Sequence, residues 1–266
     1  MTSMAVQKKI SKSCHERSVK LIDTLAAFGG ALNPNASGIA KKDLLMEMKR
    51  LTISMAIVRP LLLPQGGDVV TINQRLLQNC SGDPRLIPCP LMIPAGAGDL
   101  PSEEEQADFF LKQGARMVWI RPGPDRYNLM EVVSGRMFNA LAKRRLPVLC
   151  LMDLVSLADM DMLLRRHAGL RIIAANVGYG QLRVILPMLK FYSGFYLATG
   201  RGAADHDFLP CMERSGVIHK IFFGTGFPEA EPTMAVTQLM FTDISEKNRR
   251  AVGAENILRL LDEVQP

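Results

Sequence analysis

Short runs of apolar residues alternate along the chain with longer stretches in which apolar positions recur at helical spacing. The short runs are rich in β-branched and small side chains and predict strands. These predicted strands cover residues 20–28, 54–59, 86–93, 117–121, 147–152, 171–177, 194–199 and 220–225. Such alternation is typical of repeated β–α units, which build a parallel sheet.

The longer stretches predict helices. They cover residues 41–51, 102–113, 131–144, 157–166, 181–192, 203–215, 232–241 and 245–264. Ser102 is followed by three glutamates, a capped and acidic start that suits the helix dipole. The segment 60–83 is the least regular crossover. Eight strand–helix units in about 250 residues predict an α/β fold, a single (β/α)8 TIM barrel, with a doubly wound open sheet as the alternative.

The chain shows no linker, charge block or internal repeat, so we expect one barrel over residues 18–266, preceded by a flexible N-terminal arm over residues 1–17. Hydrophobic residues make up 48% and charged residues 22%, which is ordinary for a packed protein and too apolar for disorder. No apolar run approaches the roughly 18 residues that a membrane-spanning helix needs, so we expect no membrane association.

Charge and cysteine usage narrow the function classes further. The net charge is +6, but the basic residues are scattered and aromatic residues make up only 6%. This pattern argues against nucleic-acid binding but is compatible with a pocket for a small anion. The five cysteines are widely separated and form no C-x-x-C pair. They predict reduced thiols, and with an N-terminus that lacks a signal-peptide core they predict a cytoplasmic protein.

Three segments share their order and spacing with a known family. Residues 21–29 read LIDTLAAFG, residues 221–228 read IFFGTGFP and residues 253–260 read GAENILRL. They resemble the amidohydrolase-related TIM barrels, whose patterns there are I-D-x-H-x-H-F-G, G-S/T-D-x-P and G-x-N-A-x-R-L. Residues 147–180 also resemble the fifth and sixth strands of that family, so the resemblance covers about residues 20–264. It implies a TIM barrel whose site lies at the carboxyl ends of the strands.

In that family, histidines and an aspartate at the strand ends hold one or two divalent metals, which activate water and polarise the scissile carbonyl. The matching positions in this chain are Leu25, Ala27, Leu151, Asn176 and Gly226. Leucine, alanine and glycine side chains have no lone pair to offer, and asparagine offers only a carbonyl oxygen. Set against the resemblance, these residues predict a barrel that has lost the family metal site and holds no cofactor.

Three arginines follow predicted strands: Arg59, Arg121 and Arg201. An arginine fork pairs bidentately with a carboxylate or a phosphate, so two of them together would bind a small anion. Alternatively, each arginine pairs with a nearby carboxylate, such as Asp125 or Asp153, and only seals the barrel.

Acid–base chemistry without a metal needs a carboxylate or histidine in a dry pocket. The catalytic candidates at the strand ends are Asp23, Asp153 and His206, although Asp23 is equally suited to a structural role and His206 to a solvated loop. Asn176 and Thr225 join the arginines as ligand-binding candidates.

Three functions follow from these candidates. The first is an amidohydrolase-like pseudoenzyme that binds or senses a small molecule. The second is a metal-independent hydrolase or lyase for a small anionic carbonyl compound, with Arg59 and Arg121 on the anion and Asp153 or Asp23 moving a proton. The third is a metal-dependent hydrolase with unusual ligands, taken from Asp153, His206 and Asn176. By analogy with related barrels, we also expect a homodimer.

Overall fold

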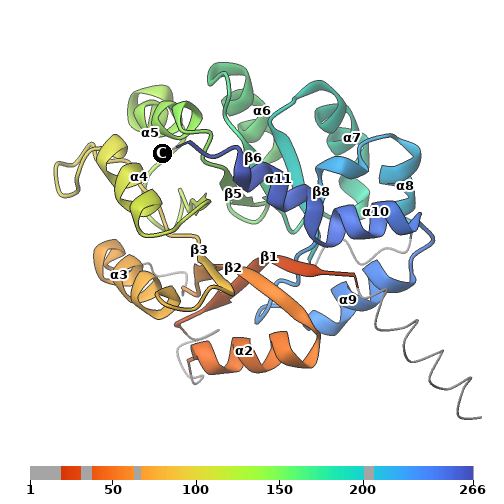
Figure 1. The fold of residues 1–266 in the computed structure, drawn as a ribbon. Coiled ribbons are helices and arrows are strands. Elements are labelled where there is room, and N and C mark those ends of the chain that lie inside the picture. Colours follow the sequence, from red (N-terminus) through yellow and green to blue (C-terminus); the bar gives the residue numbers. More distant parts are fainter. Residues whose placement is uncertain (1–18, 31–37, 63–66, 201–206, 266) are drawn as a thin grey trace, which may run out of the picture.

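The computed structural model describes residues 19–30, 38–62, 67–200 and 207–265, and it shows parallel strands that alternate with helices (Figure 1). The strands are β1 (Leu21–Phe28), β2 (Ile53–Pro60), β3 (Leu86–Pro88), β4 (Val118–Trp119), β5 (Val148–Leu151), β6 (Ile172–Ala175), β7 (Phe195–Ala198) and β8 (Ile221–Phe222). The helices are α2 (Lys41–Arg50), α3 (Val69–Cys80), α4 (Glu103–Lys112), α5 (Glu131–Lys143), α6 (Leu157–Arg166), α7 (Leu182–Phe191), α8 (Phe208–Arg214), α9 (Pro232–Phe241), α10 (Glu246–Arg250) and α11 (Asn256–Asp262).

The strands close into a barrel through two seams. Strands β1 to β3 form one parallel sheet and β4 to β8 form another. At the first seam, Leu91 bridges to Trp119 of β4. At the second, the Thr24 N–H donates to the Phe223 carbonyl at 3.0 Å, which joins β1 to the residue after β8. The predicted (β/α)8 barrel is therefore confirmed, and the open sheet is excluded.

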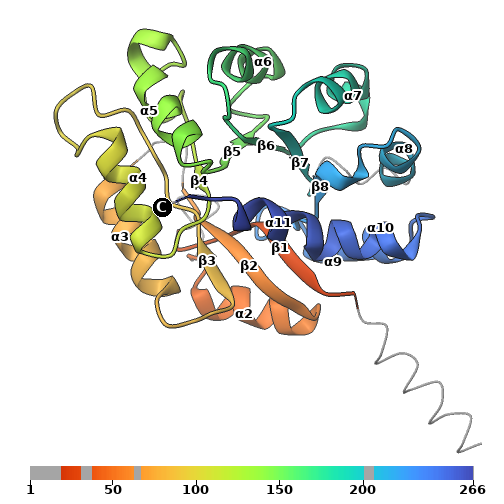
Figure 2. The same ribbon diagram turned by 45° about the horizontal axis from the view of Figure 1, so that its top comes forward.

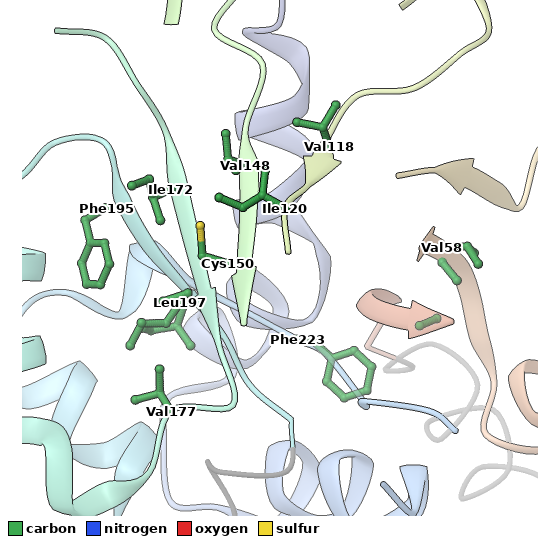
Figure 3. Close-up of a cluster of buried hydrophobic side chains, with 14 of the residues drawn as sticks. Val58, Val118, Ile120, Val148, Cys150, Ile172, Val177, Phe195, Leu197 and Phe223 are labelled. Atoms are coloured by element: carbon green, nitrogen blue, oxygen red, sulfur yellow. The ribbon is translucent and has the colours of Figure 1, made fainter. Parts of the chain in front are cut away.

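Alternating side chains of each strand fill two separate cores, as the pleat of a barrel strand requires. Val148 and Cys150 of β5 point outward and pack with Ile172 of β6 in the layer beneath the helices (Figure 3). Leu149 and Leu151 belong instead to the cluster inside the barrel. Only the carboxyl end of this interior reaches the loops where a site is expected.

The amino end of the barrel is closed by the C-terminal helix. Ile257 and Leu260 of α11 pack with the interior cluster. The Asn256 side chain donates to the carbonyl of Ile218, just before β8, and to that of Ile221, the first residue of β8. Figure 2 shows α11 lying across the centre of the ring of strands. Small molecules therefore have to reach the interior from the opposite, carboxyl end.

One helix of the structure was not predicted, and one predicted helix differs from the structure. The irregular segment 60–83 contains α3, whose first turn is capped by the Asp68 side chain on the N–H groups of Val70 and Thr71. The predicted helix 245–264 is divided by a π-helical turn at Ala251–Glu255. Gly253 in that turn lies so close to β1 that a Cβ there would come within 2.8 Å of the Lys20 carbonyl oxygen.

Two predicted segments lie wholly or partly outside the residues that the structure describes. The N-terminal arm, residues 1–17, and the first residues of the predicted helix 203–215 lie outside the described residues. Within the described residues, no helix is long and apolar enough to cross a membrane.

Candidate functional site

Two arginines converge at the carboxyl end of the barrel, above the ring of Trp119. Arg59 is the next-to-last residue of β2. Arg121 follows β4, two residues after Trp119, and so lies on the same face of that strand. The guanidinium carbon of Arg59 lies 4.9 Å from the centroid of the Trp119 ring, and that of Arg121 lies 5.7 Å from it. Both arginines are almost fully buried, at 2% and 3% exposure. The convergence that would create an anion site is therefore present.

Each of these arginines also has a carboxylate partner within the chain. Arg121 donates to Asp125 through Nη2 at 2.7 Å and through Nε at 3.2 Å, and both side chains are buried. The pairing of Arg121 with Asp125 is the one expected if the arginines only close the barrel and bind no ligand. Arg59 donates through Nη2 to Glu229, whose side chain is 35% exposed. The two positive charges over Trp119 are thus matched by two negative charges, one buried and one at the edge of solvent.

Two N–H groups at this place are buried without a partner in the described part of the chain. They are Nε of Arg59 and Nε1 of Trp119. A buried N–H that lacks an acceptor costs about 1–3 kcal/mol, and such groups are rare in folded proteins. Because the guanidinium carbon of Arg59 lies 4.9 Å from the centroid of the Trp119 ring, the two donors belong to the same part of the barrel. The site therefore combines positive charge with two hydrogen-bond donors that have no acceptor among the described residues.

Asp23 lies at the seam between β1 and β8. Its Oδ1 accepts from the N–H groups of Leu25 and Thr225, each at 2.9 Å, and its Oδ2 accepts from the Thr225 hydroxyl at 2.5 Å. Burial raises the pKa of Asp23, against the hydrogen bonds from Thr225 and Leu25 and the charge of Arg59, which lower it. Both oxygens are engaged in closing the barrel. This geometry favours the structural role for Asp23 and gives Thr225, a ligand-binding candidate, a structural partner.

The remaining candidates lie elsewhere at the mouth or outside the described residues. The Asn176 amide lies 3.5 Å from Oδ2 of Asp153, so the ends of β5 and β6 place these two side chains together. Asn176 has a φ of +61°, a left-handed conformation that asparagine tolerates better than most residues. His206 and Arg201 lie outside the described residues. Asp23 is thus engaged where β1 meets β8, whereas Asp153 and Asn176 contact one another at the ends of β5 and β6.

The positions that the resemblance matches with the family's metal ligands carry side chains that do not fit a divalent cation. Leu25, Ala27 and Leu151 are buried apolar residues. The Leu25 side chain packs so tightly toward β7 that a Cβ on Gly200 would come within 2.8 Å of its Cδ2 atom. Across residues 19–30, 38–62, 67–200 and 207–265, no three histidine, cysteine, aspartate or glutamate side chains gather as a metal site would require. The side chains at these positions therefore provide no set of ligands for a divalent metal.

The site contains two residues that the sequence pattern did not single out, Trp119 and Glu229. Trp119 is the one tryptophan of the chain and stands two positions before Arg121, so strand alternation could have placed it beneath that arginine. Glu229 is 170 residues away from Arg59 in sequence, and no local pattern indicates that they pair.

Comparison with known proteins gives the family. Residues 67–262 match the sequence profile of a family described as Amidohydrolase. A comparison with curated proteins finds no match. Among solved structures, 2,6-dihydroxybenzoate decarboxylase from Rhizobium is similar, with a TM-score of 0.71, 15% identity, and 92% of this chain and 99% of that chain covered.

Two other decarboxylase structures are similar to the same degree. One is 5-carboxyvanillate decarboxylase from Sphingomonas paucimobilis, with a TM-score of 0.71, 13% identity, and coverage of 92% of this chain and 99% of that one. The other is a dihydroxybenzoic acid decarboxylase from Polaromonas sp. JS666 with bound manganese and the inhibitor 2-nitroresorcinol. Its TM-score is 0.70, its identity 13%, and the coverage 92% of this chain and 97% of that one. These structures share the fold of this chain, and the profile match over most of its length shows that the chain belongs to the amidohydrolase family.

Proposed function

We propose that this amidohydrolase-family barrel binds a small carboxylate at its mouth without a resident divalent metal, and that it acts as a binding or regulatory protein, a pseudoenzyme of its family. The observation that carries the proposal is the pair of buried guanidinium groups over Trp119, with Nε of Arg59 and Nε1 of Trp119 lacking an acceptor in the described part of the chain.

A carboxylate suits this place because it combines negative charge with two acceptor oxygens. Charge-assisted hydrogen bonds from a guanidinium are roughly twice as strong as neutral ones, and burial increases their strength. One oxygen can accept from Arg59 and the other from Trp119 or Arg121. The similar decarboxylase structures are named for 2,6-dihydroxybenzoate and 5-carboxyvanillate, so aromatic carboxylates are the first class to test.

The donor set supports the proposed lack of a resident metal. Four of the five positions that would hold the family metal carry leucine, alanine or glycine, and the fifth, Asn176, supplies only a neutral amide oxygen. The acid–base alternative has weak support, because both oxygens of Asp23 hold the barrel seam closed. A binding function needs neither a metal nor a free proton carrier.

Trp119 is the chain's one tryptophan and lies beneath both guanidinium groups, so its fluorescence reports on the site directly. We expect benzoate and 2,6-dihydroxybenzoate to change this fluorescence in a saturable way and to raise the melting temperature. Benzamide, which has the same ring but no charge, should do neither. Inorganic phosphate separates a preference for carboxylates from binding of any anion.

Two results would contradict the proposal. One is that no carboxylate changes the fluorescence or the melting temperature. The other is that 2,6-dihydroxybenzoate is consumed in the presence of a chelator, with release of carbon dioxide. That outcome, combined with loss of turnover in Asp153→Asn, would support the metal-independent lyase instead.

A further inference from the structure

The carboxylate that pairs with Arg59 comes from the segment that follows β8. The Ala27 N–H of β1 donates to the Phe227 carbonyl at 2.9 Å, and the Ala230 N–H donates to the Gly226 carbonyl at 2.9 Å. These bonds fold residues 226–230 into a turn beside β1 and β2. The backbone at Glu229 is therefore held in place close to Arg59, and only the side chain of Glu229 has to move to make or break the ion pair.

The burial of the two partners differs sharply. The Arg59 side chain is 2% exposed, whereas that of Glu229 is 35% exposed. Glu229 thus lies on the solvent side of a guanidinium that solvent does not reach. The other ion pair of the site has no such asymmetry, because the Arg121 and Asp125 side chains are 4% and 5% exposed. Arg121 and Asp125 form a sealed pair, and Arg59 and Glu229 form a pair that is open on one side.

We infer that Glu229 is an internal competitor for the carboxylate site: it holds Arg59 in the free protein and is displaced when a ligand carboxylate binds. This inference rests on the proposed function. The chemistry of the two occupants is the same, because each offers a carboxylate to the same guanidinium. A displaced Glu229 moves to water, which costs little for a side chain that is already one-third exposed, whereas Arg59 cannot be left buried without a counter-charge. An exchange of carboxylates satisfies both requirements.

The exchange sets a minimum affinity that a ligand needs in order to displace Glu229 from Arg59. A tethered competitor acts at the high effective concentration that its short tether imposes, so weak carboxylates fail to displace it. The apparent dissociation constant equals the intrinsic one divided by the fraction of molecules in which Glu229 has left Arg59. Ligands that also provide acceptors for Nε of Arg59 and Nε1 of Trp119 gain contacts that Glu229 does not make in the free protein. The turn that carries Glu229 thereby selects for ligands with two acceptor oxygens.

The test compares Glu229→Gln with Glu231→Gln by calorimetric titration with benzoate and by Trp119 fluorescence. Glu231 is the matched control, since it lies two residues further along and pairs with the exposed Arg50. Removing the charge of Glu229 should lower the dissociation constant for benzoate about tenfold, and the change at position 231 should leave it unaltered. Glu229→Asp keeps the charge but shortens the reach, so it should also tighten binding and serves if the glutamine variant folds poorly.

The outcomes separate this inference from the proposed function. If the unaltered protein and Glu231→Gln bind benzoate while Glu229→Gln and Glu229→Asp bind it equally or more weakly, Glu229 is a fixed structural partner and the exchange is refuted. If none of the four proteins binds any carboxylate, the proposed function itself fails, and the exchange fails with it.

Discussion

Replacement of Arg59 by methionine is expected to weaken the binding of benzoate by about 30-fold or more, which is about 2 kcal/mol. Methionine keeps much of the length and apolar bulk of the arginine stem but provides neither charge nor N–H donors. The Trp119 ring remains, so the loss isolates the contribution of the guanidinium that lies 4.9 Å above it. Calorimetric titration of the variant beside the unaltered protein measures the effect.

Arg136→Met is the matched control, because the Arg136 side chain is 73% exposed on α5 and contributes nothing to the mouth. Its affinity for benzoate should equal that of the unaltered protein. Loss of Arg59 leaves Glu229 without its partner, so the double variant Arg59→Met, Glu229→Gln checks that poor binding is not a result of charge repulsion by Glu229. Full affinity in either variant that lacks Arg59 would contradict the assigned site.

Asp23→Ala is expected to lower the free energy of unfolding by about 3 kcal/mol. The substitution leaves the N–H groups of Leu25 and Thr225 and the Thr225 hydroxyl without an acceptor inside the barrel. Each unsatisfied buried group costs about 1–3 kcal/mol. Structural relaxation between β1 and β8 makes the total destabilisation smaller than the sum of the three individual costs. Urea denaturation measures the change. Asp108→Ala, which removes a half-exposed partner of Arg144, should cost no more than about 1 kcal/mol.

The carboxyl group of Asp23 also determines whether its contribution to the stability of the fold rises or falls with pH. Because burial raises the pKa of Asp23, the folded protein holds this proton at pH values where the unfolded chain has released it. Between the ordinary and the raised pKa, folding takes up a proton, so the contribution of Asp23 to stability falls as pH rises. The stability of the unaltered protein relative to Asp23→Asn should therefore decline through that window and then level off. A difference that grows with pH would show that hydrogen bonding, and not burial, dominates this carboxyl.

Much of the barrel could be predicted from the chain because its strands carry a strong local signal. Runs such as 147–152 and 171–177 are apolar and bounded by turns, and each contains the strand that the structure places there. The helix α3 was missed because the run before it is rich in proline and glycine, and its start depends on the single cap Asp68. The π turn at Ala251–Glu255 depends on a close approach to Lys20, which lies more than 200 residues earlier.

The candidate site was predicted only in part, for a related reason. Strand order places Arg59 and Arg121 at one end of the barrel, so their convergence follows from the fold. Their partners differ in range: Asp125 is four residues from Arg121, whereas Glu229 reaches Arg59 across the closing seam. The role of Asp23 likewise depends on Thr225, 202 residues away. The local sequence pattern indicates which charged residues lie at the mouth. Which of them pair with one another depends on contacts that form only when the barrel closes.

The metal content of the purified protein tests the central claim most directly. Protein produced with added zinc and manganese, isolated without chelator and analysed by mass spectrometry, is expected to contain neither metal in stoichiometric amount. The reason is that positions such as Leu25 and Gly226 offer no side-chain ligand atom. One equivalent of zinc or manganese per chain, retained through dialysis and lost on replacement of Asp153 or His206, would contradict the account and establish a metal-dependent barrel with unusual ligands.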